Sequence, residues 1–315
     1  MKAIVTGGAG FIGSHLTRRL LKEGWSVLVV DNLSSGYLHN IPEGAEFKWM
    51  DLTQENSVLG LPREGVEVVF HLASHVGQET SFENPLLDLK ANALATMILL
   101  KWCLEHKVKQ FIFASSVNVY GNAQQMPITE NTPIDPPSPY AVGKIASEYL
   151  CRIYQNLGLN STCLRLFNIY GPGQDLSNLK QGMASIYMAY VARREPILVR
   201  GSQERFRDFV FVEDAVEAFY RCMNEKAYGQ VYNVAAGRKI LVSELLRIII
   251  KAFGHDPEKY PIISGDPTPQ DQFGFYGEAT RLKQDLGWEP RVKLEGGIPL
   301  MANWAQTAIK GVKRL

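Results

Sequence analysis

The glycine-rich stretch Gly7–Gly13 constrains the fold of this chain more than any other part of the sequence. It follows a short apolar run, Lys2–Thr6, and it precedes apolar residues at helical spacing that continue to Lys22. A second apolar run, Trp25–Val30, then ends at Asp31. Glycines between a strand and a helix permit a tight turn and let a phosphate group approach the helix N-terminus. This order of elements therefore predicts a dinucleotide-binding unit at the start of the chain.

The spacing of the glycines and the position of Asp31 favour NAD as the dinucleotide. Gly8, Gly10 and Gly13 fit the dinucleotide fingerprint, and Gly7 with Gly10 and Gly13 fits a variant of it. Asp31 stands about 20 residues further on, where such units carry an acidic residue. Its carboxylate can accept hydrogen bonds from ribose hydroxyls, and its charge repels the 2′-phosphate of NADP. We therefore expect NAD to be preferred over NADP.

Apolar runs and helical patterns continue to alternate through the first half of the chain. Further strands are expected at 45–49, 66–72, 110–114 and 161–167, with helical patterns at 92–105 and around Tyr140. Such alternation predicts an α/β fold with a Rossmann-type, doubly wound parallel sheet, whose ligands lie at the carboxyl ends of the strands.

The character of the sequence changes after Asn168. Prolines and glycines become frequent, and a helix is expected at 182–194. We therefore expect an NAD-binding domain over 1–167 and a smaller, mixed α/β substrate-binding domain over 168–315. The sequence leaves open whether 209–235 packs back on the first domain.

A tyrosine and a lysine stand four residues apart in the stretch Ser138–Tyr149. On a helix, Tyr140 and Lys144 would share one face, one turn apart. Pro139 suits the first position of such a helix. A nearby ammonium favours the phenolate, and we expect it to lower the pKa of Tyr140 by about three units, roughly 4 kcal/mol. The pair would then supply a base that works near neutral pH.

Composition excludes several other classes of protein. The formal net charge is +1, which predicts no binding of nucleic acid or of an anionic membrane surface. Every apolar run is shorter than the ~18 residues of a membrane span, and no signal-peptide pattern is present, so we expect a cytoplasmic protein. The four cysteines, Cys103, Cys151, Cys163 and Cys222, lack metal-ligand spacing, and we expect free, buried thiols and no metal site.

Further motifs occur along nearly the whole chain. They are Thr6–Gly13, Asp31–Leu33, Asp51–Leu52, His71–Ala73, Ser115–Gly121, Ser138–Tyr140 with Lys144, Phe167–Gly171, Arg207–Phe209 with Glu213–Asp214, and Leu286–Trp288. Together they resemble the extended short-chain dehydrogenase/reductase family, in particular its NAD-dependent nucleotide-sugar epimerases of the UDP-glucose 4-epimerase type.

The resemblance implies roles for individual residues. Tyr140 would be the base that takes the proton of the sugar hydroxyl, Lys144 would bind the nicotinamide ribose, and Ser116 would hydrogen-bond the reacting hydroxyl. The residues that would contact NAD are Gly7, Gly10, Phe11, Ile12, Gly13, Asp31, Asn32, Leu33, Ser34, Ser35, Gly36, Asp51, Leu52, Leu72, Ala73, Ser74, Asn92, Tyr140, Lys144 and Phe167. The nucleotide sugar, which by this resemblance would be UDP-linked, would be bound by Ser116, Tyr140, Asn168, Arg207 and Asp271.

The resemblance also implies a homodimer. The helices near 92–105 and 142–156 would pair across the interface as a four-helix bundle.

The two residues after Ser116 favour one reaction. In related 4,6-dehydratases they are Asp and Glu, and related decarboxylases carry Glu at the second position; here they are Val117 and Asn118, which cannot transfer protons. We therefore expect a UDP-hexose 4-epimerase of the UDP-glucose/UDP-galactose type, acting through a transient 4-keto sugar. Another NAD-dependent nucleotide-sugar enzyme of this fold (an epimerase at a different carbon, a reductase or an atypical dehydratase) stays open, as does, more remotely, a non-catalytic NAD-sensing protein.

The stretch Thr268–Asp271 departs from the Arg-Pro-Gly-Asp that is frequent in the family. One expected pyrophosphate-binding arginine is therefore absent, and Arg205 and Lys180 are the candidates to replace it. Phe275 stands about where a bulky residue would narrow the sugar pocket, which disfavours N-acetylated sugars. The sequence leaves the sugar and the nucleotide base open.

Overall fold

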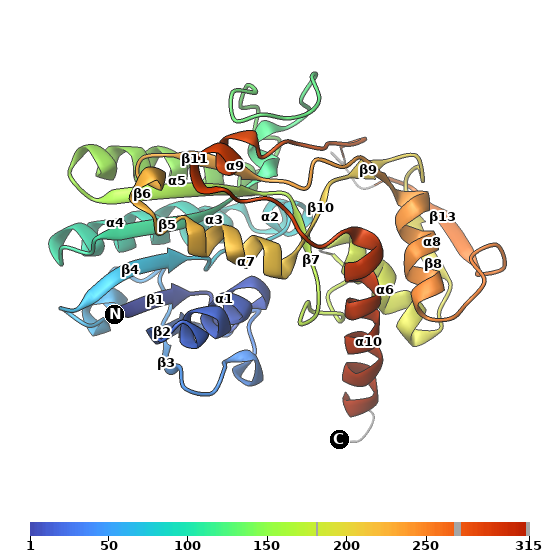
Figure 1. The fold of residues 1–315 in the computed structure, drawn as a ribbon, viewed down its shortest axis with the longest axis horizontal. Helices are drawn as coiled ribbons and strands as arrows, with labels where there is room; N and C mark the ends of the chain where they lie inside the picture. The colour runs from blue at the N-terminus through green and yellow to red at the C-terminus, as the bar shows by residue number, and fades with distance from the viewer. Residues whose placement is uncertain (181, 268–271, 313–315) are drawn as a thin grey trace.

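A parallel β-sheet forms the centre of the protein (Figure 1). The computed structural model describes residues 1–180, 182–267 and 272–312. Within these residues, seven strands pair in parallel in the order β11-β6-β5-β4-β1-β2-β3. They are β1 (Lys2–Thr6), β2 (Ser26–Asp31), β3 (Glu46–Trp49), β4 (Val66–His71), β5 (Gln110–Ser116), β6 (Asn160–Leu166) and β11 (Val231–Val234).

Helices cover both faces of the sheet, because its inner strands β1, β4 and β5 are buried on both sides. On β1, Val5 belongs to a core that includes Leu16 of α1 (Phe11–Lys22) and Phe219 of α7 (Val212–Arg221). Its neighbour Ile4 points the other way, into a core with Leu99 of α4 (Ala95–Glu105) and Cys151 of α5 (Pro139–Asn156). Neighbouring residues of a strand face opposite sides, so two apolar layers need two layers of helices. The predicted doubly wound α/β fold is confirmed.

Shorter elements link these layers. The path from β4 to α4 runs through α2 (Gln78–Glu83), α3 (Pro85–Leu89) and a π-helical turn, Lys90–Leu94. Single 3₁₀ turns occur at Leu38–Asn40, Glu55–Gly60, Val117–Tyr120 and Glu225–Ala227.

A second group of elements packs beyond one end of the sheet, at the right of Figure 1. Its core is apolar and includes buried residues of α6 (Met183–Arg193), α8 (Val242–Ala252) and α10 (Leu294–Val312). The parallel pair β8 (Ile197–Arg200) and β13 (Ile262–Gly265) belongs to this group. The pairs β7 (Asn168–Tyr170) with β10 (Phe209–Phe211) and β9 (Phe206–Arg207) with β12 (Ile240–Leu241) lead from the sheet to it, and α9 (Thr280–Leu286) lies beside β11.

The segment 209–235 returns to the central sheet. Helix α7 packs against α1, and β11 pairs with β6 at the edge of the sheet. Two boundaries also differ from the expected ones. Strand β5 continues through Ser116, and the helix expected at 92–105 begins with the π turn instead of regular α-helix.

A buried ion pair joins helix α5 to strand β6 of the sheet. Arg165 of β6 and Glu148 of α5 are 7% and 5% exposed, and the Arg165 guanidinium donates to both carboxylate oxygens, with Nη2 2.7 Å from Oε2 and Nε 3.0 Å from Oε1. Arg165 Nη1 also donates to the hydroxyl of Tyr120, at 2.8 Å, and Ser115 of β5 donates to Glu148. Every strong hydrogen-bonding group of the pair thus has a partner, which offsets the cost of burying the two charges.

Breaking this pair should destabilise the fold strongly. Arg165→Met leaves the Glu148 carboxylate buried without its cation, and we expect the free energy of unfolding to fall by about 3–5 kcal/mol. Urea denaturation followed by circular dichroism measures it. The matched control is Arg247→Met, which breaks the exposed pair Arg247–Glu258 and should cost about 1 kcal/mol or less. Equal losses in the two variants would contradict this account of α5.

Candidate catalytic and cofactor site

The glycine turn between β1 and α1 leaves room for backbone alone. A Cβ on Gly13 would lie 2.1 Å from the carbonyl oxygen of Gly7, and one on Gly7 would lie 2.7 Å from the backbone nitrogen of Ala73. Gly7 also has a φ of +69°, which favours glycine. Behind the turn, Phe11 and Ile12 begin α1, whose first N–H groups have no partner within the helix. A turn this tight at the start of a helix fits the pyrophosphate of a dinucleotide.

Asp31 is buried at the carboxyl end of β2 and braces the loops around it. Its Oδ2 accepts from the N–H of Ala9, at 3.0 Å, and its Oδ1 accepts from the N–H of Leu33, at 2.8 Å. Each carboxylate oxygen keeps further lone pairs, so the group fits a ribose as well. Asn32, Ser34 and Ser35 are exposed beside it, Gly36 is buried against Ala9, Asp51 accepts from Thr53, and Leu52 is buried.

The segment after β4 is held by Asn92, which is 1% exposed and lies in the π turn. Its Nδ2 donates to the carbonyl of His75, at 3.0 Å, and to Oδ1 of Asp88, at 3.1 Å, while its Oδ1 accepts from Ser74, at 2.6 Å. The other oxygen of Asp88 is 3.0 Å from Nδ1 of His75. The side chain of Asn92 is therefore engaged within the protein, where it positions the partly buried Leu72–Ser74 edge.

Ser116, Tyr140 and Lys144 come together at the carboxyl end of β5. Ser138 caps α5 by accepting from the N–H of Ala141, at 3.3 Å, and Pro139 is the first helical residue, as expected. The ammonium of Lys144 donates to the carbonyl of Ala114, at 2.9 Å, and lies 5.7 Å from the centroid of the Tyr140 ring. Tyr140 and Ser116 are both 8% exposed, and their side chains are hydrogen-bonded.

The expectation of a lowered tyrosine pKa is wrong for the chain by itself. Burial raises the pKa of Tyr140 to about 12; the hydrogen bond from Ser116 opposes this, and the charge of Asp88 adds to it. Burial also lowers the pKa of Lys144 to about 7, although the charges of Asp88 and Glu148 raise it. Desolvation disfavours both charged forms here, and the spacing of the two residues in the sequence does not reveal it.

The residues expected at the substrate lie where β7, β9 and β10 meet. Asn168 Nδ2 donates to the carbonyl of Asp208, at 3.0 Å. The guanidinium of Arg207 lies 4.8 Å from the centroid of the Phe275 ring, and burial and then the charge of Arg205 lower the pKa of Arg207 to about 10. Arg207 therefore stays charged at neutral pH. Phe167 is buried in contact with Phe275.

The two candidates for the missing arginine have different surroundings. Arg205 is 7% exposed, and its guanidinium lies next to Gly201, beside Pro267. Its Nε donates to the carbonyl of Ser202, at 3.0 Å, whereas Lys180 forms an exposed ion pair with Glu83, at 2.6 Å. Asp271, expected at the nucleotide ribose, lies outside the described residues.

Two parts of this site were missed by sequence reasoning. Asp88 and Glu148 carry the negative charges nearest to Lys144, yet neither stands in a recognisable motif. One signal was available for Glu148. Arg165 interrupts the apolar strand around Cys163–Phe167, and a charge buried in a strand requires a partner.

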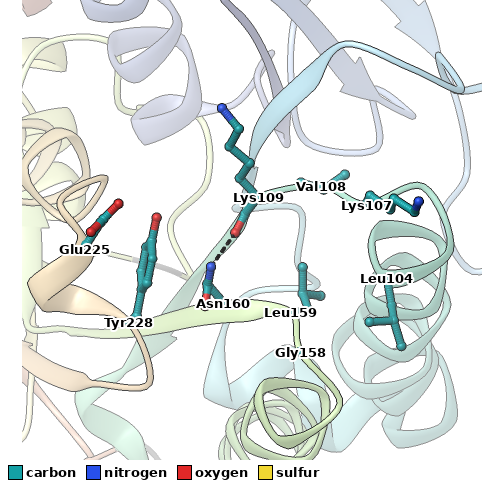
Figure 2. A pocket seen from close by; sticks show the side chains of 9 residues that line it. All are labelled: Leu104, Lys107, Val108, Lys109, Gly158, Leu159, Asn160, Glu225 and Tyr228. Atoms are coloured by element: carbon teal, nitrogen blue, oxygen red, sulfur yellow. Dashed lines mark hydrogen bonds between the residues drawn. The ribbon is translucent and has the colours of Figure 1, made fainter.

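A hollow of about 440 Å³ lies at the amino ends of strands β5 and β6, away from the residues described above (Figure 2). Lys109 precedes β5 and Asn160 begins β6, and the Asn160 amide donates to the Lys109 carbonyl, at 3.0 Å. This hollow faces the amino ends of the strands, whereas Ser116 stands at the carboxyl end of β5. It is therefore not part of the candidate site.

The side chains of the described residues form no cluster of three or more His, Cys, Asp or Glu that could hold a metal ion. All four cysteines are buried and free, as expected. Among the described helices, none is long and apolar enough to span a membrane.

The charge of Asp31 generates a testable prediction about the cofactor. Asp31→Asn keeps a side chain that can accept hydrogen bonds but removes the charge that repels a 2′-phosphate. We expect the preference for NAD over NADP to fall on the order of tenfold, measured by calorimetric titration of both dinucleotides. Asp51→Asn, two residues after β3, is the control: Asp51 is expected at the adenine, which NAD and NADP share, so this variant should keep the preference whatever its effect on affinity. An unchanged ratio in Asp31→Asn would refute its role.

Comparison with known proteins matches this geometry. Residues 3–235 match the NAD dependent epimerase/dehydratase family. A UDP-glucose 4-epimerase of Mycolicibacterium smegmatis is 34% identical over 307 residues, covering 95% of this chain and 96% of the relative. The structure of a Thermotoga maritima UDP-glucose 4-epimerase with UDP-glucose superposes with a TM-score of 0.93 at 35% identity, covering 98% of this chain and 100% of that one.

A Thermus thermophilus UDP-glucose 4-epimerase in complex with NAD superposes with a TM-score of 0.90 at 33% identity, covering 98% and 100% of the two chains. Both the matched family and the tight glycine turn with its adjoining carboxylate indicate NAD as the cofactor. The chain belongs to the NAD-dependent epimerase/dehydratase family of enzymes that act on nucleotide sugars.

Proposed function

We propose that this enzyme is a UDP-hexose 4-epimerase that interconverts sugars of the UDP-glucose and UDP-galactose type. The observation that carries the proposal is the meeting of Ser116, Tyr140 and Lys144 beside a cofactor turn, with Val117 and Asn118 next to them. Epimerisation at C4 needs one base and a reversible hydride transfer, and it needs no second acid–base pair. Relatives that resemble the chain along nearly its whole length carry the same activity in their names.

Bound NAD would supply a reversible hydride transfer at C4 of the sugar and, in its oxidised form, a positive charge on the nicotinamide. The protein supplies the proton chemistry. The phenolate of Tyr140 takes the proton of the C4 hydroxyl through Ser116, which is hydrogen-bonded to Tyr140, and Tyr140 gives the proton back when the hydride returns to the sugar. Burial makes a phenolate at Tyr140 a strong base, while the ammonium of Lys144, fixed by the carbonyl of Ala114, favours its formation.

Substrate residues must hold the nucleotide while the sugar turns. A 4-keto sugar presents its other face only if it rotates, so the fixed part is the pyrophosphate. Arg207 is suited to that group because a guanidinium donates in pairs to phosphate oxygens, and the Phe275 ring supports its plane. Asn168 lies on β7, which pairs with β10 just after Arg207, and its amide donates to the carbonyl of Asp208.

Two neighbouring residues disfavour the dehydratase and decarboxylase alternatives. Val117 is buried and apolar, and the backbone N–H of Asn118 donates to the Ser116 hydroxyl, at 3.2 Å. Neither side chain can exchange a proton with a substrate at neutral pH. The test is to incubate the purified protein with a panel of nucleotide sugars and to identify the products by NMR. Stoichiometric formation of NADH would instead indicate a dehydrogenase or reductase.

Removing the base should abolish turnover without emptying the cofactor site. Tyr140→Phe keeps the ring but loses the hydroxyl, and we expect the rate of epimerisation to fall by about 10²–10⁴-fold. Bound NAD, measured after denaturation, should stay at the wild-type level. Tyr154→Phe on the same helix is the matched control and should keep full activity. A Tyr140→Phe enzyme close to wild-type activity would exclude Tyr140 as the base.

We propose in addition that the enzyme is a homodimer joined through α4 and α5. Val142, Tyr149 and Ile153 lie along one face of α5 and are 44%, 51% and 53% exposed, and Met97 on α4 is 41% exposed. An apolar helical stripe of this spacing suits a second pair of helices.

A charge on this face should prevent association. Ile153→Asp places a carboxylate where the two copies would meet, and we expect a monomer in sedimentation equilibrium, against a wild-type dimer. Ile263→Asp is the matched control, since Ile263 is similarly exposed, at 52%, but lies on β13 in the second group of elements. A wild-type protein that sediments as a monomer would contradict the proposed interface.

A further inference from the structure

His15 of α1 lies between two hydrogen-bond acceptors. Its Nδ1 is 2.8 Å from a carboxylate oxygen of Glu213, on α7, and its Nε2 is 2.9 Å from the carbonyl oxygen of Pro172, in the loop after β7. A neutral imidazole has one N–H, so it can donate to only one of them. The hydrogen bond from His15 lowers the pKa of the Glu213 carboxyl, and Glu213 therefore stays ionised. Both contacts are therefore favourable only when His15 carries two protons and a positive charge.

The loop that His15 holds is attached at two points on either side of the glycine turn. Near one end, Gly173 lies against α1, where a Cβ would be 3.4 Å from the His15 ring and 3.9 Å from the Phe11 ring. At the other end, the hydroxyl of Tyr37 donates to Asp175, at 3.2 Å. Tyr37 itself is fixed to the turn, because its N–H donates to the carbonyl of Ala9, at 3.0 Å.

We propose that residues 172–175 form a strap that retains NAD at the glycine turn, and that protonated His15 fastens one end of the strap. His15 is a positioning residue, since it acts on the cofactor through Pro172. Tyr37 and Asp175 fasten the other end. The proposal rests on the use of NAD by this family and is independent of which sugar the enzyme converts.

Glu213 is the charged partner of His15, because the other acidic groups nearby pair with Arg19. On α1, Arg19 forms ion pairs with Glu217 of α7, with Nη1 2.9 Å from the carboxylate, and with Glu23, with Nε 3.1 Å from the carboxylate. Arg18 and Arg19 act on Glu213 only through their charge, in the same direction as His15. The edge of the Phe11 ring closes the remaining side, with centroids 5.9 Å apart.

This arrangement predicts the sign of the pH dependence. His15 needs its second proton to hold the strap in place. Once the strap is released, His15 no longer needs that proton. Loss of a proton from His15 turns one ring nitrogen into a lone pair that faces an acceptor, so the fastening weakens as pH rises. NAD should therefore leave slowly near pH 6 and faster near pH 8.

The experiment measures release of the cofactor with no sugar present. The full-length protein is loaded with radiolabelled NAD, chased with excess unlabelled NAD and sampled by gel filtration. We expect release from the wild type to be roughly tenfold faster at about pH 8 than at about pH 6, as for the loss of one charge-assisted hydrogen bond. His15→Phe should release at the fast rate at both pH values. Tyr37→Phe should release faster than wild type at both, with the pH dependence retained.

His255→Phe is the matched control, because His255 is exposed beyond α8 and should leave both rates unchanged. Wild-type release that does not vary with pH, or a His15→Phe protein that follows the wild type, would overturn the role of His15. If His15→Phe melts at a lower temperature than the wild type, its release rate is not used, and Tyr37→Phe becomes the test of the strap. A Tyr37→Phe protein that releases NAD at the wild-type rate would overturn the proposal that residues 172–175 retain NAD. Because no sugar enters the assay, a failure of the proposed epimerase activity stays distinguishable from a failure of the strap.

Discussion

The register of helix α5 on strand β5 is the constraint on which the catalytic site depends. Three consecutive residues of β5 bond to side chains on three successive turns of α5. The carbonyl of Ala114 accepts from Lys144, and the next two residues, Ser115 and Ser116, bond to Glu148 and Tyr140. The buried pair of Glu148 with a guanidinium of β6 then fixes the depth of the helix. A shift by one residue would break all of these contacts and separate the proposed base from its proton relay.

Burial gives this site its chemistry and explains why the cofactor must complete it. The same exclusion of water that would make a phenolate at Tyr140, the proposed base, strongly basic keeps Tyr140 protonated in the chain by itself, with its pKa raised to about 12. Lys144 is pushed toward its neutral form by the same cause. Charges added by a bound cofactor act in a medium of low polarity, where they count for more than in water. Such charges would favour the phenolate of the proposed base more than the chain by itself does.

The substrate side depends on a different anchor. Asp208 is 0% exposed and accepts from the N–H groups of the adjacent residues Ala236 and Gly237 and from that of Gly277, which lies much further along the chain. It thereby ties the strands that carry the proposed pyrophosphate contacts to the sheet and to the segment leading to α9. Burial raises the pKa of Asp208 to about 6 against these hydrogen bonds, so the anchor is ionised at neutral pH.

The sequence by itself determined the fold class, because apolar strands alternating with amphipathic helices can bury both faces of a sheet only by double winding. It also located the glycine turn with Asp31 and the spacing of Tyr140 and Lys144, which are local patterns. It could not yield β11, the engagement of Asn92 within the π turn, or the direction of the tyrosine pKa. These follow from contacts between residues far apart in the chain, such as Arg165 with Glu148 and His15 with Pro172. Tertiary structure decided them, because desolvation and pairing depend on what surrounds a group in space, and a local pattern carries no record of those neighbours.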